Sequence, residues 1–188
     1  MGGNVEIRGK KGVIMKVVVV DVQKGIVNEP GLYNFDGFVK NMTEVLALAR
    51  ANNVEVIHVH HDEGPGSGFT FGDEDFEFAD WATPKAGEKV FVKSINSCFG
   101  SKEFTNYLEE SGDKDLMIIG VQTDLCIDAT VKSAFERGYN VILPKGTNST
   151  FANDYMDAET TYRYYNDRMW PDRFAKCVSL DAAKEMLA

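Results

Sequence analysis

The chain has 188 residues, of which 44% are hydrophobic and 26% are charged, and its formal net charge is −9. This length supports one domain with a sizeable core. The longest apolar runs, near Val17–Val20 and Leu116–Val121, are far too short to cross a bilayer. Acidic residues outnumber basic residues by 29 to 20 and no basic stripe interrupts them, so neither nucleic acid nor a membrane is an expected partner.

The first residues of the chain are expected to lie outside the folded domain. Residues 1–14 are expected to be a leader or extension outside the core, and residues 15–188 to form one domain. The first residues are polar, glycine-bearing and basic, and they lack the apolar segment of a signal peptide.

The cysteines Cys98, Cys126 and Cys177 are an odd number without close pairs, which argues against a disulfide framework and a zinc ribbon. This cysteine use is typical of a reducing compartment, so a cytoplasmic location is expected.

Apolar runs and helical patterns alternate along the chain. Strands are expected over Val17–Val20, Val54–His60, Val90–Val92, Leu116–Gly120, Val141–Leu143 and Cys177–Val178. Helices are expected from Asp36 to Asn52, Ser101 to Glu110, Asp124 to Arg137, Asp157 to Met169 and Asp181 to Leu187. The glycine-rich, acidic segment His61–Lys89 is expected to be a functional loop or to carry hidden short elements. The alternation predicts an α/β fold with a parallel sheet, helices on both faces and right-handed crossovers.

The strand before Gly120 leads directly into a helix. The chain is expected to turn at Gly120 and to begin the helix at Thr123 or Asp124, both good N-cap residues, while Gly138 ends it. Cys126 then lies in the first helical turn, where unpaired N–H groups and the helix dipole favour a thiolate. We therefore expect a lowered pKa and a nucleophilic role for Cys126. The alternative is that Cys126 is a small buried apolar residue.

Three strands are followed by side chains of complementary chemistry. Asp21, Lys93 and Cys126 each come just after a buried strand, and ligands of such sheets bind at the carboxyl ends of the strands. Asp21 can accept the thiol proton, Lys93 can stabilise the carboxylate and the thiolate, and Cys126 can attack a carbonyl carbon. Taken singly, a strand-end aspartate is often a cap or a metal ligand, and a strand-end lysine is often solvated. The conjunction of the three favours catalysis.

In these residues the sequence resembles the isochorismatase-like cysteine hydrolases, the superfamily that includes nicotinamidases and N-carbamoylsarcosine amidases. The resemblance spans about Val17 to Leu143, and the chain after Pro144 matches less clearly. The residues that carry it are Asp21 with Gln23, Lys93 followed by Ser94 and Phe99, and the run Gly120–Cys126 with Thr130, Ala134 and Gly138-Tyr139.

The resemblance implies a single-domain three-layer sandwich, Rossmann-like, around a six-stranded parallel sheet. It implies Asp21, Lys93 and Cys126 as a catalytic triad and a cis peptide bond at Val121–Gln122. The backbone N–H groups of Gln122 and Cys126 would then form the oxyanion hole. The implied reaction is hydrolysis of a small amide or N-carbamoyl compound through a thioester, with release of ammonia. A homo-oligomer, dimer or tetramer, is also implied; members that act on isochorismate lack this cysteine.

The histidines raise a metal-dependent alternative. His58, His60 and His61 could bind Zn²⁺ or another divalent ion, as in a nicotinamidase. However, His58 stands where the nicotinamidase pattern has an aspartate, and no histidine follows His61. On a strand, His58 and His60 share one face, while His61 faces the other way or begins the loop. No cofactor is therefore expected, and His60 or His61 is expected to form a hydrogen bond near the rim of the site.

The substrate is expected to be a small molecule. Gln23, His60, Phe69 and Phe99 are candidate pocket residues, while most other aromatic side chains are expected to serve core or interface packing. Two further functions belong to other classes. The chain could be a thiol redox protein, for which Cys98 is the only plausible resolving cysteine. It could also be a non-catalytic interaction domain, which the conjunction of Asp21, Lys93 and Cys126 disfavours.

Overall fold

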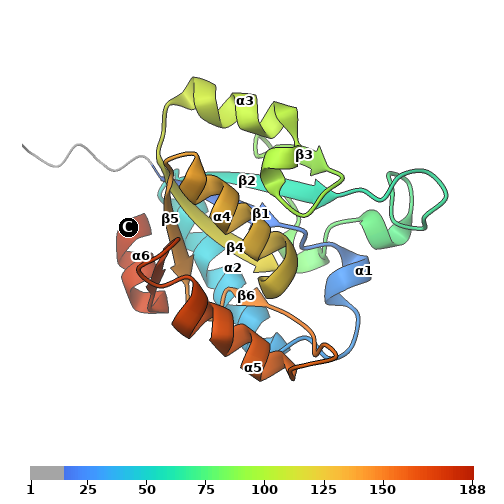
Figure 1. Cartoon of the computed structure of the whole chain (residues 1–188). Coiled ribbons are helices and arrows are strands. Elements are labelled where there is room, and N and C mark those ends of the chain that lie inside the picture. The colour runs from blue at the N-terminus through green and yellow to red at the C-terminus, as the bar shows by residue number, and fades with distance from the viewer. Residues whose placement is uncertain (1–14) are drawn as a thin grey trace, which may run out of the picture.

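The computed structural model describes residues 15–188, so the predicted leader, residues 1–14, lies outside the described residues (Figure 1). The strands are β1 Met15–Val20, β2 Glu55–His61, β3 Lys89–Lys93, β4 Asp115–Val121, β5 Asn140–Pro144, β6 Asn148–Ser149 and β7 Lys176–Val178. The α-helices are α1 Lys24–Val27, α2 Phe35–Ala51, α3 Lys102–Ser111, α4 Asp128–Glu136, α5 Ala158–Arg163 and α6 Leu180–Leu187. Two π-helical turns, η4 Thr123–Ile127 and η5 Tyr164–Met169, directly precede α4 and follow α5.

The strands form one parallel sheet in the order β3-β2-β1-β4-β5-β7, with β6 beside the end of β4. The predicted α/β class and all six predicted strands are confirmed. The seventh strand, β6, was not predicted because its two residues carry no periodic pattern. It matters for the site because it pairs with the last residues of β4, just before the predicted nucleophile.

Two layers of helices cover the sheet, as the strand pattern requires (Figure 1). On one face, Val17 and Val19 of β1 belong to a core cluster with buried residues of α2 and α6. On the other face, Val18 and Val20 belong to a cluster with α3 and α4. Successive residues of a strand point to opposite faces, so the run of four valines contributes side chains to both core clusters. None of the described helices is long and apolar enough to cross a membrane.

The segment around Gly120 differs from its prediction. Gly120 is not a turn: it lies within β4, which continues to Val121, and its φ is +129°. A Cβ atom at Gly120 would lie 2.1 Å from the backbone oxygen of Val20. The glycine is therefore required for the close approach of β4 to β1 at the edge where the site lies. Gly138 ends α4 with a φ of +78°, as predicted.

The predicted caps of the nucleophile helix are also wrong. The backbone enters the π-turn at Gln122, and neither Thr123 nor Asp124 caps it. Both side chains are occupied elsewhere: Thr123 Oγ1 donates to Asn148 Oδ1 at 2.7 Å, and Asp124 accepts from the hydroxyl of Thr150. Long-range hydrogen bonds have replaced the local caps that the sequence pattern favours.

A buried amide pair extends these contacts to the last helical layer. Asn148 and Asn166 donate to each other through their side-chain amides, at 3.0 and 2.9 Å, and both are fully buried. Asn166 also donates to the carbonyl of Tyr162. Thr123, Asn148 and Asn166 thus form a satisfied polar network that ties the π-turn η4 to the second π-turn η5.

We predict that Gly120→Ala destabilises the fold by about 3 kcal/mol or more, because the new Cβ meets backbone rather than a movable side chain. Gly138→Ala is the matched control: its φ is also positive, but no atom lies within 4 Å of the added Cβ. It should cost only about 1–2 kcal/mol, the ordinary cost of the left-handed region. Urea denaturation measures both. Equal losses in the two variants would contradict the close-approach argument.

We also predict that Asn166→Ala costs about 2 kcal/mol or more, because it leaves the buried amide of Asn148 without its partner. Asn106→Ala, on the exposed face of α3, is the control and should change the free energy of unfolding by less than about 0.5 kcal/mol. Thermal or urea unfolding distinguishes them. A change at Asn166 no larger than that at Asn106 would show that the network does not stabilise the fold.

Candidate active site

Asp21 follows β1 and lies inside the protein. Its side chain is about 1% exposed, and its backbone N–H donates to the carbonyl of Val59 at 2.9 Å. Its φ of +52° is in the left-handed region, which few residues other than glycine adopt. The chain therefore leaves β1 by a bend at Asp21 while keeping the pairing with β2. This bend fixes where the carboxylate lies.

Lys93 is the last residue of β3 and is equally buried. Its ammonium nitrogen lies 2.8 Å from Oδ2 of Asp21 and 3.4 Å from Sγ of Cys126. The structure thus brings the three predicted residues together at the carboxyl edge of the sheet. A carboxylate, an ammonium and a thiol in contact are the groups that nucleophilic chemistry requires.

Cys126 lies in the π-turn between β4 and α4. The carbonyl of Gln122 accepts hydrogen bonds from the N–H groups of Leu125 and Ile127, which closes this turn. Cys126 is partly buried, and its Sγ lies 4.0 Å from Oδ1 of the exposed Asn96. Asn96 was not among the predicted site residues. The only sequence signal for it is its position three residues after Lys93.

The peptide bond between Val121 and Gln122 is cis, at the position that the family resemblance implied. Gln122 is partly buried and precedes the turn that carries Cys126. The backbone N–H groups of Gln122 and Cys126 therefore belong to the same short segment as the nucleophile. Their predicted role as oxyanion donors remains a prediction.

The expected lowering of the Cys126 pKa is contradicted. Burial raises the pKa of the Cys126 thiol, the negative charge of Asp21 raises it further, and the Lys93 ammonium opposes both only in part. The carboxylate of Asp21 acts on the thiol in addition to the helix terminus and has the opposite effect on its pKa. Burial also raises the pKa of Asp21 above its ordinary value, against the attraction of Lys93. Burial lowers the pKa of Lys93, but Asp21 and the neighbouring thiols outweigh it and the net shift is upward.

The three histidines do not converge on one point. Nε2 of His58 lies 3.1 Å from a carboxylate oxygen of Glu88, and burial lowers the pKa of His58 to about 4. His60 packs against Phe78, with ring centroids 3.6 Å apart, and burial lowers its pKa to about 3. His61 lies at the triad, where its Nδ1 is 3.1 Å from the ammonium nitrogen of Lys93.

Within residues 15–188, one group of three His, Cys, Asp or Glu side chains is close enough to hold a metal ion: Asp21, His61 and Cys126. Their candidate ligand atoms lie within 4.8 Å of one another. However, the Lys93 ammonium contacts all three of these side chains, so a positive charge already lies among them. A divalent ion does not fit this arrangement beside a protonated lysine.

Two of the candidate pocket residues are held in the protein interior. The side chain of Gln23 is fully buried, and it donates to the carbonyls of His61 and Phe76 and accepts from the N–H of His61. His60 is 3% exposed and packs between aromatic rings. Through these hydrogen bonds Gln23 fixes the end of β2 to the loop that follows it, and His60 packs that loop against the strand.

The two candidate phenylalanines lie in different surroundings. Phe69 is partly buried, and its ring centroid is 6.5 Å from that of His61, so it lies near the triad. Phe99 packs against Phe104 and Tyr139, with Arg137 over its ring, as part of the core beneath α3 and α4. Phe69 is therefore the better placed of the two to contact a substrate.

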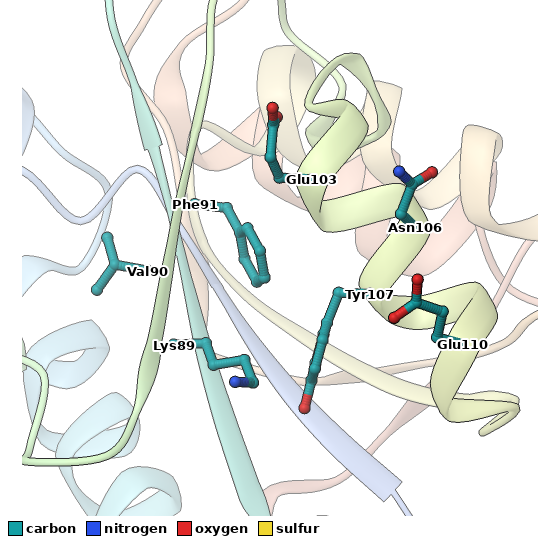
Figure 2. A pocket seen from close by; sticks show the side chains of 7 residues that line it. All are labelled: Lys89, Val90, Phe91, Glu103, Asn106, Tyr107 and Glu110. Atoms are coloured by element: carbon teal, nitrogen blue, oxygen red, sulfur yellow. The ribbon is translucent and has the colours of Figure 1, made fainter.

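A separate surface hollow lies between the edge strand β3 and α3 (Figure 2). Phe91 and Lys89 of β3 face Tyr107 of α3 there, and the Lys89 ammonium is 4.8 Å from the centre of the Tyr107 ring. Neither Lys93 nor the other triad residues line this hollow. It is thus distinct from the triad.

Comparison with known proteins identifies a matching family. Residues 16–179 match the isochorismatase domain family. The chain is 32% identical over 111 residues to the secreted isochorismatase effector Isc1 of Verticillium dahliae, covering 58% of each chain. It is 23% identical over 183 residues to the ureidoacrylate amidohydrolase RutB of Agrobacterium fabrum, covering 78% of this chain and 80% of RutB.

Solved structures of other proteins share this fold. A cysteine hydrolase from Pseudomonas syringae pv. phaseolicola superposes with a TM-score of 0.85 over 95% of this chain and 94% of that one, at 20% identity. The matched segment spans less than two thirds of the length of Isc1. The family match covers most of the chain, including Asp21, Lys93 and Cys126. The chain belongs to the isochorismatase family.

Proposed function

We propose that this protein is a cysteine amidohydrolase that cleaves the C–N bond of a small amide or N-carbamoyl compound and releases ammonia. The observation that carries the proposal is the Lys93 ammonium held 2.8 Å from Asp21 and 3.4 Å from the thiol of Cys126. The relative RutB is named an amidohydrolase, and the structural neighbour is named a cysteine hydrolase, which supports the same class.

In the first half of the reaction, Asp21 accepts the proton of Cys126 as Sγ attacks the carbonyl carbon. A tetrahedral intermediate forms, and its oxygen carries the negative charge. The backbone N–H groups of Gln122 and Cys126 donate to this oxygen, and the Lys93 ammonium stabilises the charge on the site. When the intermediate collapses, the C–N bond breaks and Asp21 gives its proton to the nitrogen. Ammonia leaves and a thioester to Cys126 remains.

In the second half, a water molecule attacks the thioester carbon while Asp21 accepts a proton from that water. The C–S bond breaks, the acid product leaves, and Asp21 returns the proton to Cys126. The carboxyl group thus alternates between base and acid. Its raised pKa suits this role, because a carboxyl group that binds a proton more readily than usual is a better base than an ordinary aspartate.

The alternatives are less well supported. A metal-dependent nicotinamidase needs several ligands around one ion, yet His58 contacts Glu88 while His61 contacts Lys93. We therefore propose no metal cofactor. For a redox protein, Cys98 is an unfavourable resolving cysteine because it is fully buried, and burial raises its pKa to about 12. The homo-oligomer and the cytoplasmic location stay predictions.

We predict that wild-type protein releases ammonia from at least one member of a panel of nicotinamide, pyrazinamide, N-carbamoyl amino acids and biuret-type ureas. Cys126→Ala should abolish release, because no thioester can form. Coupled ammonia detection measures both, with and without a chelator. Cys177→Ala is the control, since Cys177 lies in β7 outside the triad. Release that survives in Cys126→Ala, or that the chelator removes, would contradict the thiol mechanism.

We predict opposite effects of Asp21→Asn on two properties of the site. Asp21 raises the pKa of Cys126, so removing its charge should shift the pH profile of Cys126 alkylation by iodoacetamide toward lower pH. Hydrolysis should nevertheless fall by about 100-fold or more, because the acid–base group is lost. Mass spectrometry of Cys126 and the ammonia assay give the two readouts.

Lys93→Met provides the opposite control for that experiment, because it removes the charge that lowers the thiol pKa. Its alkylation profile should move toward higher pH. If Asp21→Asn also moved the profile upward, the charge of Asp21 would not be what raises the thiol pKa. If it kept hydrolysis intact, Asp21 would not be the proton acceptor.

A further inference from the structure

The ammonium group of Lys93 has a third partner beyond the triad. It lies 2.8 Å from Oδ2 of Asp21, 3.4 Å from Sγ of Cys126 and 3.1 Å from Nδ1 of His61. An ammonium has three N–H donors and no acceptor. His61 and Cys126 are the hydrogen-bond partners of this nitrogen within the described residues, and the carboxylate of Asp21 is its ion-pair partner.

The same contact determines where His61 carries its proton. Because Lys93 is held protonated by Asp21 and can only donate, Nδ1 of His61 must present its lone pair. The neutral ring then carries its hydrogen on Nε2. A cationic ring would point an N–H at an ammonium, and in agreement burial and the Lys93 charge lower the pKa of His61.

The fold positions His61 for this role from both sides. His61 ends β2, and in the parallel register it is the cross-strand partner of Lys93 at the end of β3. The buried amide of Gln23 accepts from the N–H of His61 at 2.8 Å and donates to its carbonyl at 3.0 Å. The backbone of His61 is thus fixed by one side chain, and its ring meets the lysine of the next strand.

We infer that His61 is a positioning residue of the hydrolytic site: its neutral Nδ1 accepts an N–H of Lys93 and holds the ammonium between Asp21 and Cys126. This inference deepens the proposed function and rests on it. Without the acceptor, a buried N–H of a charged group has no partner, and the nitrogen is free to shift away from the thiol. The metal alternative assigned His61 a different role, that of a ligand.

Four charged groups act on the pKa of the His61 ring. Lys93 comes from β3, Asp21 follows β1, and Asp62 and Glu63 follow His61 in the chain. Only Lys93 among them disfavours a charged ring; the three carboxylates favour it. Replacing a neutral His61 changes no charge, so an effect on Cys126 must come from the position of Lys93.

The test compares His61→Leu, which removes the acceptor, with His61→Asn, whose side-chain oxygen can take the place of Nδ1. In His61→Leu, alkylation of Cys126 by iodoacetamide near neutral pH should slow about tenfold, with a pH profile shifted toward that of Lys93→Met. His61→Asn should restore most of the rate. His58→Asn is the matched control on the same strand and should match the wild type, since His58 contacts Glu88.

A measurement on the unmodified side chain keeps the inference testable if His61→Leu does not fold. Imidazole ¹⁵N NMR of the wild type, assigned with His61→Asn, should show His61 neutral with its hydrogen on Nε2 near neutral pH. A hydrogen on Nδ1, a charged ring, or equal alkylation in His61→Leu and wild type would overturn the inference. No ammonia release by the wild type from any amide of the panel would instead refute the proposed function, while the NMR result would still decide the role of His61.

Discussion

The buried ion pair between Lys93 and Asp21 is the interaction on which the rest of the site depends. Moving two charges out of water costs several kcal/mol for each, and their attraction offsets this only if the remaining hydrogen-bonding groups are also satisfied. His61 and Cys126 provide hydrogen-bond partners for the Lys93 nitrogen, whereas the buried oxygens of Asp21 have none within the described residues and depend on the charge of Lys93. The positions of the carboxylate, the imidazole and the thiol thus follow from the needs of one ammonium group.

The parallel sheet makes this cluster possible. β1, β2 and β3 are neighbours, so the residues at their carboxyl ends lie side by side, and the register pairs His61 with Lys93. Cys126 reaches the cluster from β4, on the other side of β1, through the close approach of Gly120 and the π-turn that follows. Thr123 anchors that turn to β6. The backbone therefore supplies the positions, and the buried charges determine which side chains can occupy them.

These two contributions explain what the sequence could predict. Asp21, Lys93 and Cys126 were predictable because each follows an apolar run, and strand ends converge. His61 was placed one residue beyond its strand, so the same rule was not applied to it; extending β2 by that residue identifies it as the partner of Lys93. The pairing of Asn148 with Asn166 joins a two-residue strand without a periodic pattern to a helix distant in the sequence, so nothing in the sequence indicates it. The cap prediction at Thr123 failed for the same reason, because its hydroxyl is used by a distant residue.

The pKa of the Cys126 thiol is raised and not lowered as predicted, and this bears on the proposed reaction. Asp21 and Cys126 share one low-dielectric site, where two negative charges disfavour each other, and the pKa values of both are raised. Both shifts therefore favour a proton shared by the two groups, with the charge of Lys93 balancing the remaining negative charge. An amine leaves a tetrahedral intermediate only when its nitrogen is protonated. A fully ionised pair would lack that proton, so the raised pKa values favour keeping on the site the proton that the proposed C–N cleavage requires.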